Sequence, residues 1–213
     1  MAIEKNSLSI LIGYLAYLLV QMITQKLFWS SKFLYLILTI IGLLGAGLLL
    51  WLNQKFSYTN IIEQPKSKQN FKKVLLWGLG GIGLVFIGQI LCMLITHLVF
   101  KQNMISQNTT QLITIFKNSP IYLLNIVVAA PIIEELIFRK VFFGNLTYYF
   151  KPIIAAIISN ILFALAHHDG HFLIYFVMGC ILEWIYAKAH DLKAPMIAHS
   201  GMNLIILLFF GLR

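Results

Sequence analysis

Residues 130–139 read APIIEELIFR, a stretch that places two adjacent carboxylates and a guanidinium inside an otherwise apolar run. The whole chain of 213 residues is similarly apolar, since 60% of its residues are hydrophobic and only 11% are charged. Such a composition is typical of polytopic membrane proteins and argues against a soluble globule. The three charged side chains therefore need a specific reason to lie in a membrane segment.

Long apolar runs recur along the chain and set the fold class. A helix needs about 17–25 apolar residues to span a bilayer. We predict an all-α protein, a polytopic transmembrane helix bundle of about seven spans, with six to eight compatible with the pattern. The runs lie at residues 8–28, 33–52, 74–100, 120–138, 152–168, 171–187 and 194–212. No small-residue cleavage site follows the first run, so we expect it to remain as an anchor.

The sequence indicates one integral membrane domain, because neither a linker nor a repeat divides it. We expect residues 1–119 to supply N-terminal helices and loops and residues 120–213 to form the functional core. The formal net charge is +9, but the lysines lie in short loops between apolar runs. This distribution favours contact with membrane lipids and argues against nucleic acid as a partner.

The loops also predict the orientation in the cell membrane, since cytoplasmic loops carry an excess of Lys and Arg. With seven spans, eleven basic residues fall on the side of the N-terminus and five on the other side. We therefore expect a cytoplasmic N-terminus. The polar break at residues 101–119 is then expected to be an external loop.

The ionisable residues of the fourth run are costly, because a charge at the centre of a spanning helix costs about 2.5–3.5 kcal/mol. Arg139 follows Glu135 by four residues on the same helical face, so the two can pair. Glu134 lies about 100° further round the helix and can point elsewhere. The pattern thus separates a paired carboxylate from a free one. The alternative is a structural ion cluster near the cytoplasmic end of the helix.

The fifth run contains the sequence FALAH at residues 163–167, which places His167 at the end of this span. If the chain turns back near residues 149–151, Glu134 and His167 both lie about 24 Å from the turn at 1.5 Å per residue. The two side chains can therefore face each other across neighbouring helices.

The seventh run contains HSGMN at residues 199–203, which brings His199 and Asn203 onto one helical face. Both residues follow the preceding turn too closely to reach the same depth in a regular arrangement. A kinked or shortened helix, or a tilted sixth span, is needed to bring them level with Glu134.

The chemistry of these groups suits attack on an amide. A carboxylate and an imidazole around a shared water form a general base, while a second imidazole and a carboxamide can donate to a developing oxyanion. A Ser-His-Asp mechanism is not expected, because Ser159 and Ser200 have neither an Asp-oriented base nor a nucleophile elbow.

The three motifs resemble those of the CAAX proteases and bacteriocin-processing enzymes, the CPBP or Abi family of intramembrane proteases. The EExxxR, FxxxH and HxxxN motifs of that family occur here in order, at residues 134–139, 163–167 and 199–203. The resemblance covers about residues 120–205, and residues 1–119 add only spanning helices.

The resemblance implies a glutamate-dependent intramembrane endopeptidase, a hydrolase that acts on a peptide or membrane-protein substrate in peptide or bacteriocin maturation or in self-immunity. Glu134 would activate the water with help from His167. His199 and Asn203 would stabilise the oxyanion. The pair formed by Glu135 and the motif arginine would hold the helix bundle and tune the base.

The resemblance leads us to expect no cofactor. Two glutamates and two histidines could hold zinc, but the set includes an amide and lacks a compact HExxH pair on one helical face, which favours activated water over a metal. The neighbouring sequence HHDGH adds His168 and His171, which are expected to lie in a solvated loop.

Two other classes of function compete with the peptidase. One is a non-catalytic membrane protein, such as a bacteriocin immunity factor or scaffold, that keeps the fold and binds a peptide or another membrane protein. The other is an ion or metal transporter that uses the same Glu and His residues. A transporter would be expected to show two matched halves with broken helices, and the sequence lacks this symmetry.

Overall fold

The computed structural model of the protein describes residues 1–63 and 70–211, and every regular element in this part of the chain is a helix. The all-α prediction is therefore confirmed. The helices in chain order are α1 (Ala2–Leu27), α2 (Leu34–Lys55), α3 (Phe71–Phe100), α4 (Gln107–Asn118), α5 (Ala130–Glu134), α6 (Pro152–Ala166), α7 (Phe172–Ala189) and α8 (Lys193–Gly211).

Six helical segments of the described chain are long and apolar enough to cross a membrane. They are α1, α2, α3, the continuous segment Pro120–Tyr148 that contains α5, α7 and α8. The fifth predicted run, at residues 152–168, forms α6, which is apolar but has only 15 residues. The bundle thus agrees with the predicted six to eight spans. The expected external loop at residues 101–119 contains α4, a helix of 12 residues with no buried side chain.

The segment Pro120–Tyr148 carries the two glutamates, and its helical turns widen twice. π-helical turns occupy η3 (Asn125–Ala129) and η4 (Glu135–Gly144), on either side of α5. Pro131 accounts for the first widening, because proline lacks the N–H of a regular turn and its ring clashes with the carbonyl four residues earlier. The second widening begins between Glu134 and Glu135.

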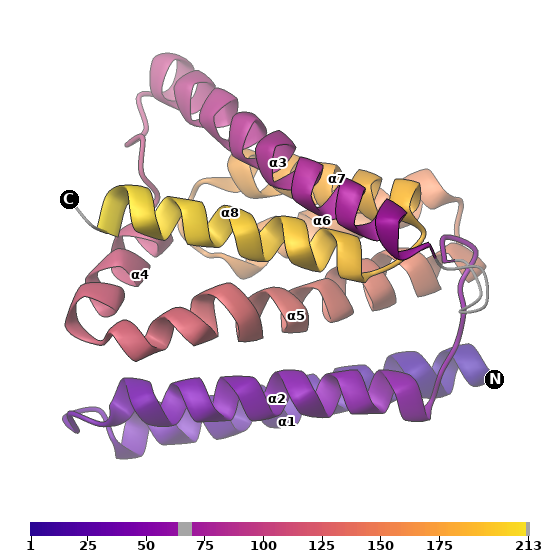
Figure 1. Ribbon diagram of the computed structural model, residues 1–213, viewed down its shortest axis with the longest axis horizontal. Coiled ribbons are helices and arrows are strands. Elements are labelled where there is room, and N and C mark those ends of the chain that lie inside the picture. Colours follow the sequence, from indigo (N-terminus) through magenta and orange to yellow (C-terminus); the bar gives the residue numbers. More distant parts are fainter. Residues whose placement is uncertain (64–69, 212–213) are drawn as a thin grey trace.

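The helices form two groups with the Pro120–Tyr148 segment between them. Figure 1 shows α1 and α2 as an antiparallel hairpin on one side, and α3, α6, α7 and α8 together on the other. Within the second group, α3 packs along both α7 and α8. The N-terminus lies at one end of the bundle and α4 lies at the opposite end (Figure 1). The Pro120–Tyr148 segment is therefore enclosed from both sides.

A glycine sets the close approach of α3 to α8. A Cβ atom on Gly81 would lie 2.6 Å from the Cδ1 atom of Ile185 and 2.9 Å from the Cβ atom of Ala198. Since real Cβ atoms do not approach so closely, only glycine fits this contact. The contact fixes the position of α8 one residue before His199.

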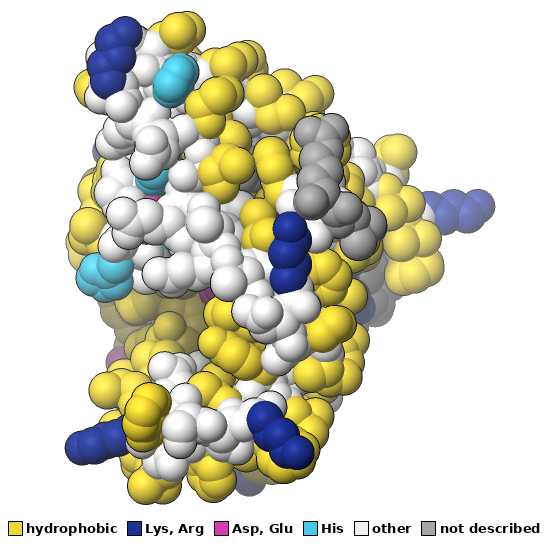
Figure 2. Space-filling model, turned by 90° about the vertical axis from the view of Figure 1, so that its left-hand side faces the viewer, with side chains coloured by type: hydrophobic (Ala, Val, Ile, Leu, Met, Phe, Trp, Pro, Cys, Tyr) yellow, Lys and Arg dark blue, Asp and Glu magenta, His cyan; other side chains and the backbone are white. Residues whose placement is uncertain are grey.

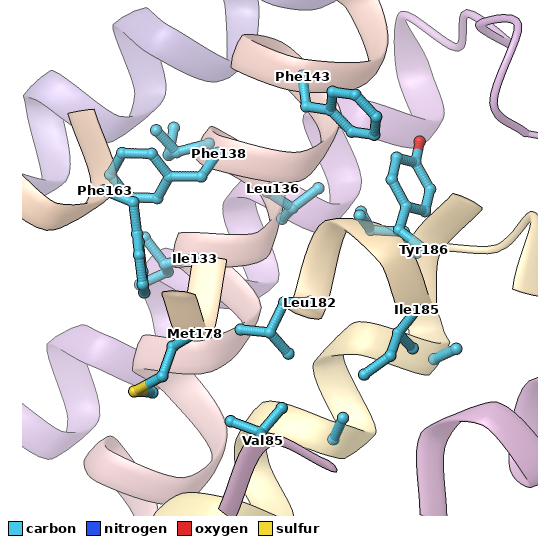
Figure 3. Close-up of a cluster of buried hydrophobic side chains, with 14 of the residues drawn as sticks. Val85, Ile133, Leu136, Phe138, Phe143, Phe163, Met178, Leu182, Ile185 and Tyr186 are labelled. Atoms are coloured by element: carbon cyan, nitrogen blue, oxygen red, sulfur yellow. The ribbon is translucent and has the colours of Figure 1, made fainter. Parts of the chain in front are cut away.

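The hydrophobic core lies against the helix that carries the glutamates. Figure 3 shows side chains from α3, the Pro120–Tyr148 segment, α6 and α7 meeting in one cluster. Phe138 packs edge to face on Phe163, with ring centroids 5.1 Å apart, and Phe143 packs in the same way on Tyr186 at 6.2 Å. These large buried side chains hold the glutamate helix in a fixed register against α6 and α7.

The turn between α7 and α8 is buried instead of projecting from the end of the bundle. Asp191 and Leu192 are buried, and the Nδ1 atom of His190 lies 2.7 Å from the carbonyl oxygen of Ile62, in the segment that follows α2. Figure 1 shows α8 starting short of the level that the Pro120–Tyr148 segment reaches at the same end. Because the turn is recessed, His199 and Asn203 lie at the depth of Glu134. From the sequence we expected a kinked, shortened or tilted helix to bring them there.

Two basic residues that were counted for the orientation are buried among the helices. Arg139 is 0% exposed and Lys140 is 2% exposed, and the Lys140 ammonium pairs with Glu63. Three others, Lys66, Lys68 and Arg213, lie outside the described residues. Without the two buried residues the sequence still has nine basic residues on the side of the N-terminus and five on the other. A cytoplasmic N-terminus stays the prediction.

Single-cysteine labelling tests this orientation. In a Cys92→Ala/Cys180→Ala background, we expect Ser30→Cys, in the α1–α2 turn, to react with a membrane-impermeant maleimide in intact cells. Ser57→Cys, after α2, should react only once the cells are permeabilised. Both serines are exposed, so accessibility within the protein does not bias the comparison. The reverse pattern would place the N-terminus outside.

Candidate active site

A cavity of about 310 Å³ lies towards the end of the bundle that carries α4 and the α6–α7 connection. All four residues predicted to be catalytic line it: Glu134, His167, His199 and Asn203. Figure 2 views this end of the molecule and shows a hollow between the α1–α2 hairpin and the helices that carry the histidines. The remaining wall combines apolar side chains with neutral polar ones, among them Tyr14, Gln89, Asn108, Tyr122, Asn125 and Tyr175.

The two adjacent glutamates have different surroundings. The side chain of Glu134 is 28% exposed and faces the cavity, whereas that of Glu135 is 0% exposed. As the sequence predicted, Glu135 pairs with Arg139, whose Nε atom lies 3.2 Å from Glu135 Oε2. The Arg139 guanidinium also lies over the ring of Phe163, with its Cζ atom 4.3 Å from the ring centroid. Arg139 is thus held within the protein, away from the cavity.

His199 connects the two glutamates. Its Nδ1 atom lies 2.8 Å from Glu135 Oε1, and its Nε2 atom lies 3.7 Å from Glu134 Oε2. The first distance is a hydrogen bond and the second is longer than one. An ionised carboxylate only accepts, so Nδ1 of His199 donates to Glu135. The sequence predicted the Glu135–Arg139 pair but gave no sign of this contact from α8.

His167 lies just after the last residue of α6 and presents one ring nitrogen to the cavity. Its Nδ1 atom is 2.8 Å from the carbonyl oxygen of Phe163 and must donate to it. In the neutral ring this leaves Nε2 as the acceptor. The ring also stacks on Tyr175, with centroids 3.8 Å apart and planes 18° apart.

Asn203 occupies a place created by Pro131. In the π-helical turn of η3, the N–H of Ala130 bonds to the carbonyl of Asn125. The next bond in that series would join Ile126 to Pro131, which has no N–H. The carboxamide of Asn203 fills this position, since its Nδ2 atom donates to the carbonyl oxygen of Ile126 at 2.9 Å. The second N–H of that amide remains for another acceptor.

One expectation for the HHDGH stretch is wrong. His171 is buried instead of solvated, because its Nε2 atom lies 2.9 Å from the carbonyl oxygen of Asn103 and its backbone N–H donates to Asp169. His168 is exposed, as expected, and adopts a left-handed backbone conformation with φ +49°. The segment before α4 packs on this loop and removes His171 from solvent, which a local sequence pattern cannot reveal.

Sequence reasoning missed Tyr175, which stacks on a predicted catalytic residue. Tyr175 follows His167 by eight residues across a chain reversal, so no helical spacing links the two.

The alternative of a zinc site can be compared with the arrangement of the side chains. In residues 1–63 and 70–211, no group of three or more His, Cys, Asp or Glu side chains is arranged to hold a metal ion.

Comparisons with known proteins agree with the motifs. Residues 116–205 match the family described as type II CAAX prenyl endopeptidase Rce1-like. Over 186 residues the chain is 31% identical to the membrane-embedded CAAX protease MroQ of Staphylococcus aureus, a match that covers 84% of this chain and 75% of MroQ. No solved structure gives a significant match.

Two further relatives match shorter parts of the chain. The putative membrane peptidase YdiL of Bacillus subtilis is 30% identical over 135 residues, which cover 63% of this chain and 55% of YdiL. The UPF0177 protein YxdF of Lactococcus lactis is 36% identical over 131 residues, which cover 58% of this chain and 71% of YxdF.

The buried pair behind the cavity predicts a large loss of stability on mutation. Glu135→Gln leaves the Arg139 guanidinium without its counter-ion, and breaking a buried pair costs about 3–5 kcal/mol. Arg139→Ala should act in the same direction. We expect both variants to unfold at a clearly lower temperature in detergent micelles and to be recovered in lower yield.

Glu4→Gln is the matched control, because the Glu4 carboxylate pairs with the N-terminal amine while 47% exposed. Exposed pairs contribute about 0–1 kcal/mol, so this variant should unfold close to the wild type. Equal unfolding temperatures for Glu4→Gln and Glu135→Gln would contradict a stabilising role for the buried pair.

Proposed function

This chain belongs to the Rce1-like CAAX endopeptidase family and is a multi-pass membrane peptidase, and we propose that Glu134 activates the water that cleaves its substrate. The observation that carries the proposal is the difference between the two glutamates. Glu134 faces the cavity, 3.7 Å from the Nε2 atom of His199, whereas Glu135 is buried and bound on both oxygens. Only Glu134 can meet a substrate.

His167 assists Glu134 in this proposal. Its Nε2 atom is the acceptor of the neutral ring, because Nδ1 donates to Phe163. A water between Glu134 and His167 can donate one hydrogen to each of them. The oxygen of that water is then directed at the scissile carbonyl, and its proton passes to Glu134, which later delivers it to the leaving amine.

His199 and Asn203 stabilise the oxyanion that forms on the scissile carbonyl. His199 has to carry protons on both nitrogens for this role, since Nδ1–H is already donated to Glu135. The Glu135 carboxylate at 2.8 Å stabilises that doubly protonated ring. Asn203 contributes its second N–H, while the first is held by the carbonyl of Ile126. Two donors from one face of α8 thus meet one oxygen.

The substrate is a peptide or a segment of a membrane protein that enters the cavity beside α4. The wall offers apolar surface and neutral polar groups, and Glu134 and the two histidines are its only acidic or basic members among the described residues. Maturation of a secreted peptide, with or without a role in self-immunity, is the physiological setting in which we place such cleavage.

Glu134→Gln is expected to abolish cleavage without unfolding the protein. The change keeps the shape of the side chain and removes the base, and general-base catalysis alone contributes about 10²–10⁴-fold to the rate. Cleavage is measured on a fluorogenic peptide library in liposomes, with unfolding temperature as the control for folding. Full activity of Glu134→Gln would show that another group activates the water.

A chelator separates water activated by Glu134 from water bound to zinc. We expect EDTA or phenanthroline to leave the cleavage rate of the wild type unchanged, because the proposed base needs no metal. Loss of activity that added zinc restores would establish the metal mechanism instead. If neither the wild type nor Glu134→Gln cleaves any peptide while both protect cells from a toxic peptide, the immunity function replaces the peptidase.

Asn203→Ala tests the oxyanion role. Removing one oxyanion donor costs about 10²–10³-fold in kcat in other hydrolases, and we expect a loss of that size with little change in KM. The variant also leaves the carbonyl of Ile126 without its donor, so its unfolding temperature must be measured alongside. An unchanged kcat in a folded Asn203→Ala protein would remove Asn203 from the mechanism.

A further inference from the structure

Two connecting segments are joined at the end of the bundle where the cavity lies. They are residues 101–106, between α3 and α4, and residues 167–171, between α6 and α7. Gln102 donates to the carbonyl of Gly170 at 3.3 Å, and His171 Nε2 lies 2.9 Å from the carbonyl of Asn103. The backbone N–H of Asn108, in the first turn of α4, reaches Asp169 Oδ2 at 3.4 Å. We refer to these two segments as the mouth loops.

Tyr175 connects the mouth loops to the site. Its hydroxyl donates to Asp169 Oδ2 at 2.7 Å and lies 3.1 Å from the hydroxyl of Ser106. Its ring stacks on the imidazole of His167 with centroids 3.8 Å apart. One side chain therefore contacts both mouth loops through its hydroxyl and His167 through its ring.

Asp169 is a firm anchor for that hydroxyl. Burial raises the pKa of the Asp169 carboxyl, but hydrogen bonds from Tyr175, His171, Ser106 and Asn108 together lower it by more, so the pKa lies below its ordinary value. The carboxylate is held in place from several directions, since Asp169 Oδ1 accepts from His171 and Oδ2 accepts from Tyr175.

His167 needs such support because of its place in the chain. It follows the last residue of α6, and the next residue, His168, has the positive φ that ends the regular backbone. The carbonyl of Phe163 accepts a hydrogen bond from one nitrogen of the ring. The ring of Phe163 also packs edge to face on the imidazole, with centroids 4.8 Å apart. Both contacts come from one residue on the same helix. A face of the imidazole, in contrast, rests on Tyr175, which belongs to α7.

We infer that Tyr175, anchored by Asp169, is a positioning residue that fixes the ring of His167 and ties its orientation to the docking of the mouth loops. The importance of this role for cleavage rests on the proposed function, whereas the orientation of the ring does not. Tyr175 touches no reacting atom in the proposed mechanism. It keeps the Nε2 atom of His167 directed at the water beside Glu134.

Two substitutions separate the ring of Tyr175 from its hydroxyl. Tyr175→Leu removes the stacked face, and Tyr175→Phe keeps the face but removes the bond to Asp169. Tyr186→Phe is the matched control, because Tyr186 is a buried tyrosine of the same helix whose hydroxyl accepts from Asn60 at 3.1 Å, far from His167. It loses a comparable hydrogen bond without touching the site.

The measurement is the nitrogen spectrum of His167 in protein with ¹⁵N-labelled histidine, in detergent micelles, with His167→Gln used to assign the signals. In the wild type we expect two separate ring signals, from a protonated Nδ1 and an unprotonated Nε2. In Tyr175→Leu the two signals should move towards each other, because a ring that turns away from the carbonyl of Phe163 exchanges between its two tautomers. In Tyr175→Phe they should move in the same direction by less. Tyr186→Phe should match the wild type.

A His167 spectrum that stays unchanged in both Tyr175 variants overturns the inference, as does an equal change in Tyr186→Phe. If Tyr175→Leu does not fold, Tyr175→Phe decides the question alone. With a cleaved peptide in hand, the misplaced ring of Tyr175→Leu should lower kcat by up to about 100-fold and leave KM nearly unchanged. Failure of the wild type to cleave any peptide counts against the proposed function, while the spectra still decide the positioning role.

Discussion

The candidate site depends on one carboxylate that lies behind the cavity and does not line it. Glu135 is fully buried, and its two oxygens are divided between Arg139 from its own helix and His199 from α8. A lone carboxylate would be very costly in this environment, so both partners must be present for the bundle to be stable. The same contacts fix the ring of His199, which leaves its other nitrogen facing Glu134. Stability and the geometry of the candidate site thus rest on the same interaction.

The irregular backbone before Pro131 also contributes to the geometry of the site. Pro131 leaves the carbonyl of Ile126 without a backbone donor, and Asn203 supplies one from α8. Two residues of α8, four positions apart, are therefore anchored to the glutamate helix at separate points. The glycine contact between α3 and α8 and the recessed α7–α8 turn set the depth at which these anchors meet. Irregular turns frequently occur at functional sites in helical proteins, and here the cause can be named.

Much of this arrangement could be predicted from the sequence, and the remainder depended on contacts between distant segments. The lengths of the apolar runs predicted the helices. The spacing of four residues predicted the pair of Glu135 with Arg139, and it separated Glu134 from this pair. Depth could be estimated only where a turn was placed correctly, which is why the recessed turn before α8 was missed. The roles of Tyr175 and His171 depend on mouth loops that are about 70 residues apart in the sequence, and no local pattern reports such packing.

The central claim is that Glu134 faces the reacting centre while Glu135 holds His199 behind it. The most direct measurement is an experimental structure of the protein bound to a peptide phosphonate, whose tetrahedral phosphorus resembles the intermediate of amide hydrolysis. The account predicts one phosphonate oxygen against the Glu134 carboxylate and another within about 2.7–3.1 Å of His199 Nε2 and Asn203 Nδ2, with Glu135 still bound to His199 Nδ1. A metal ion on the phosphonate oxygens, or a phosphonate that contacts Glu135 in place of Glu134, would contradict it.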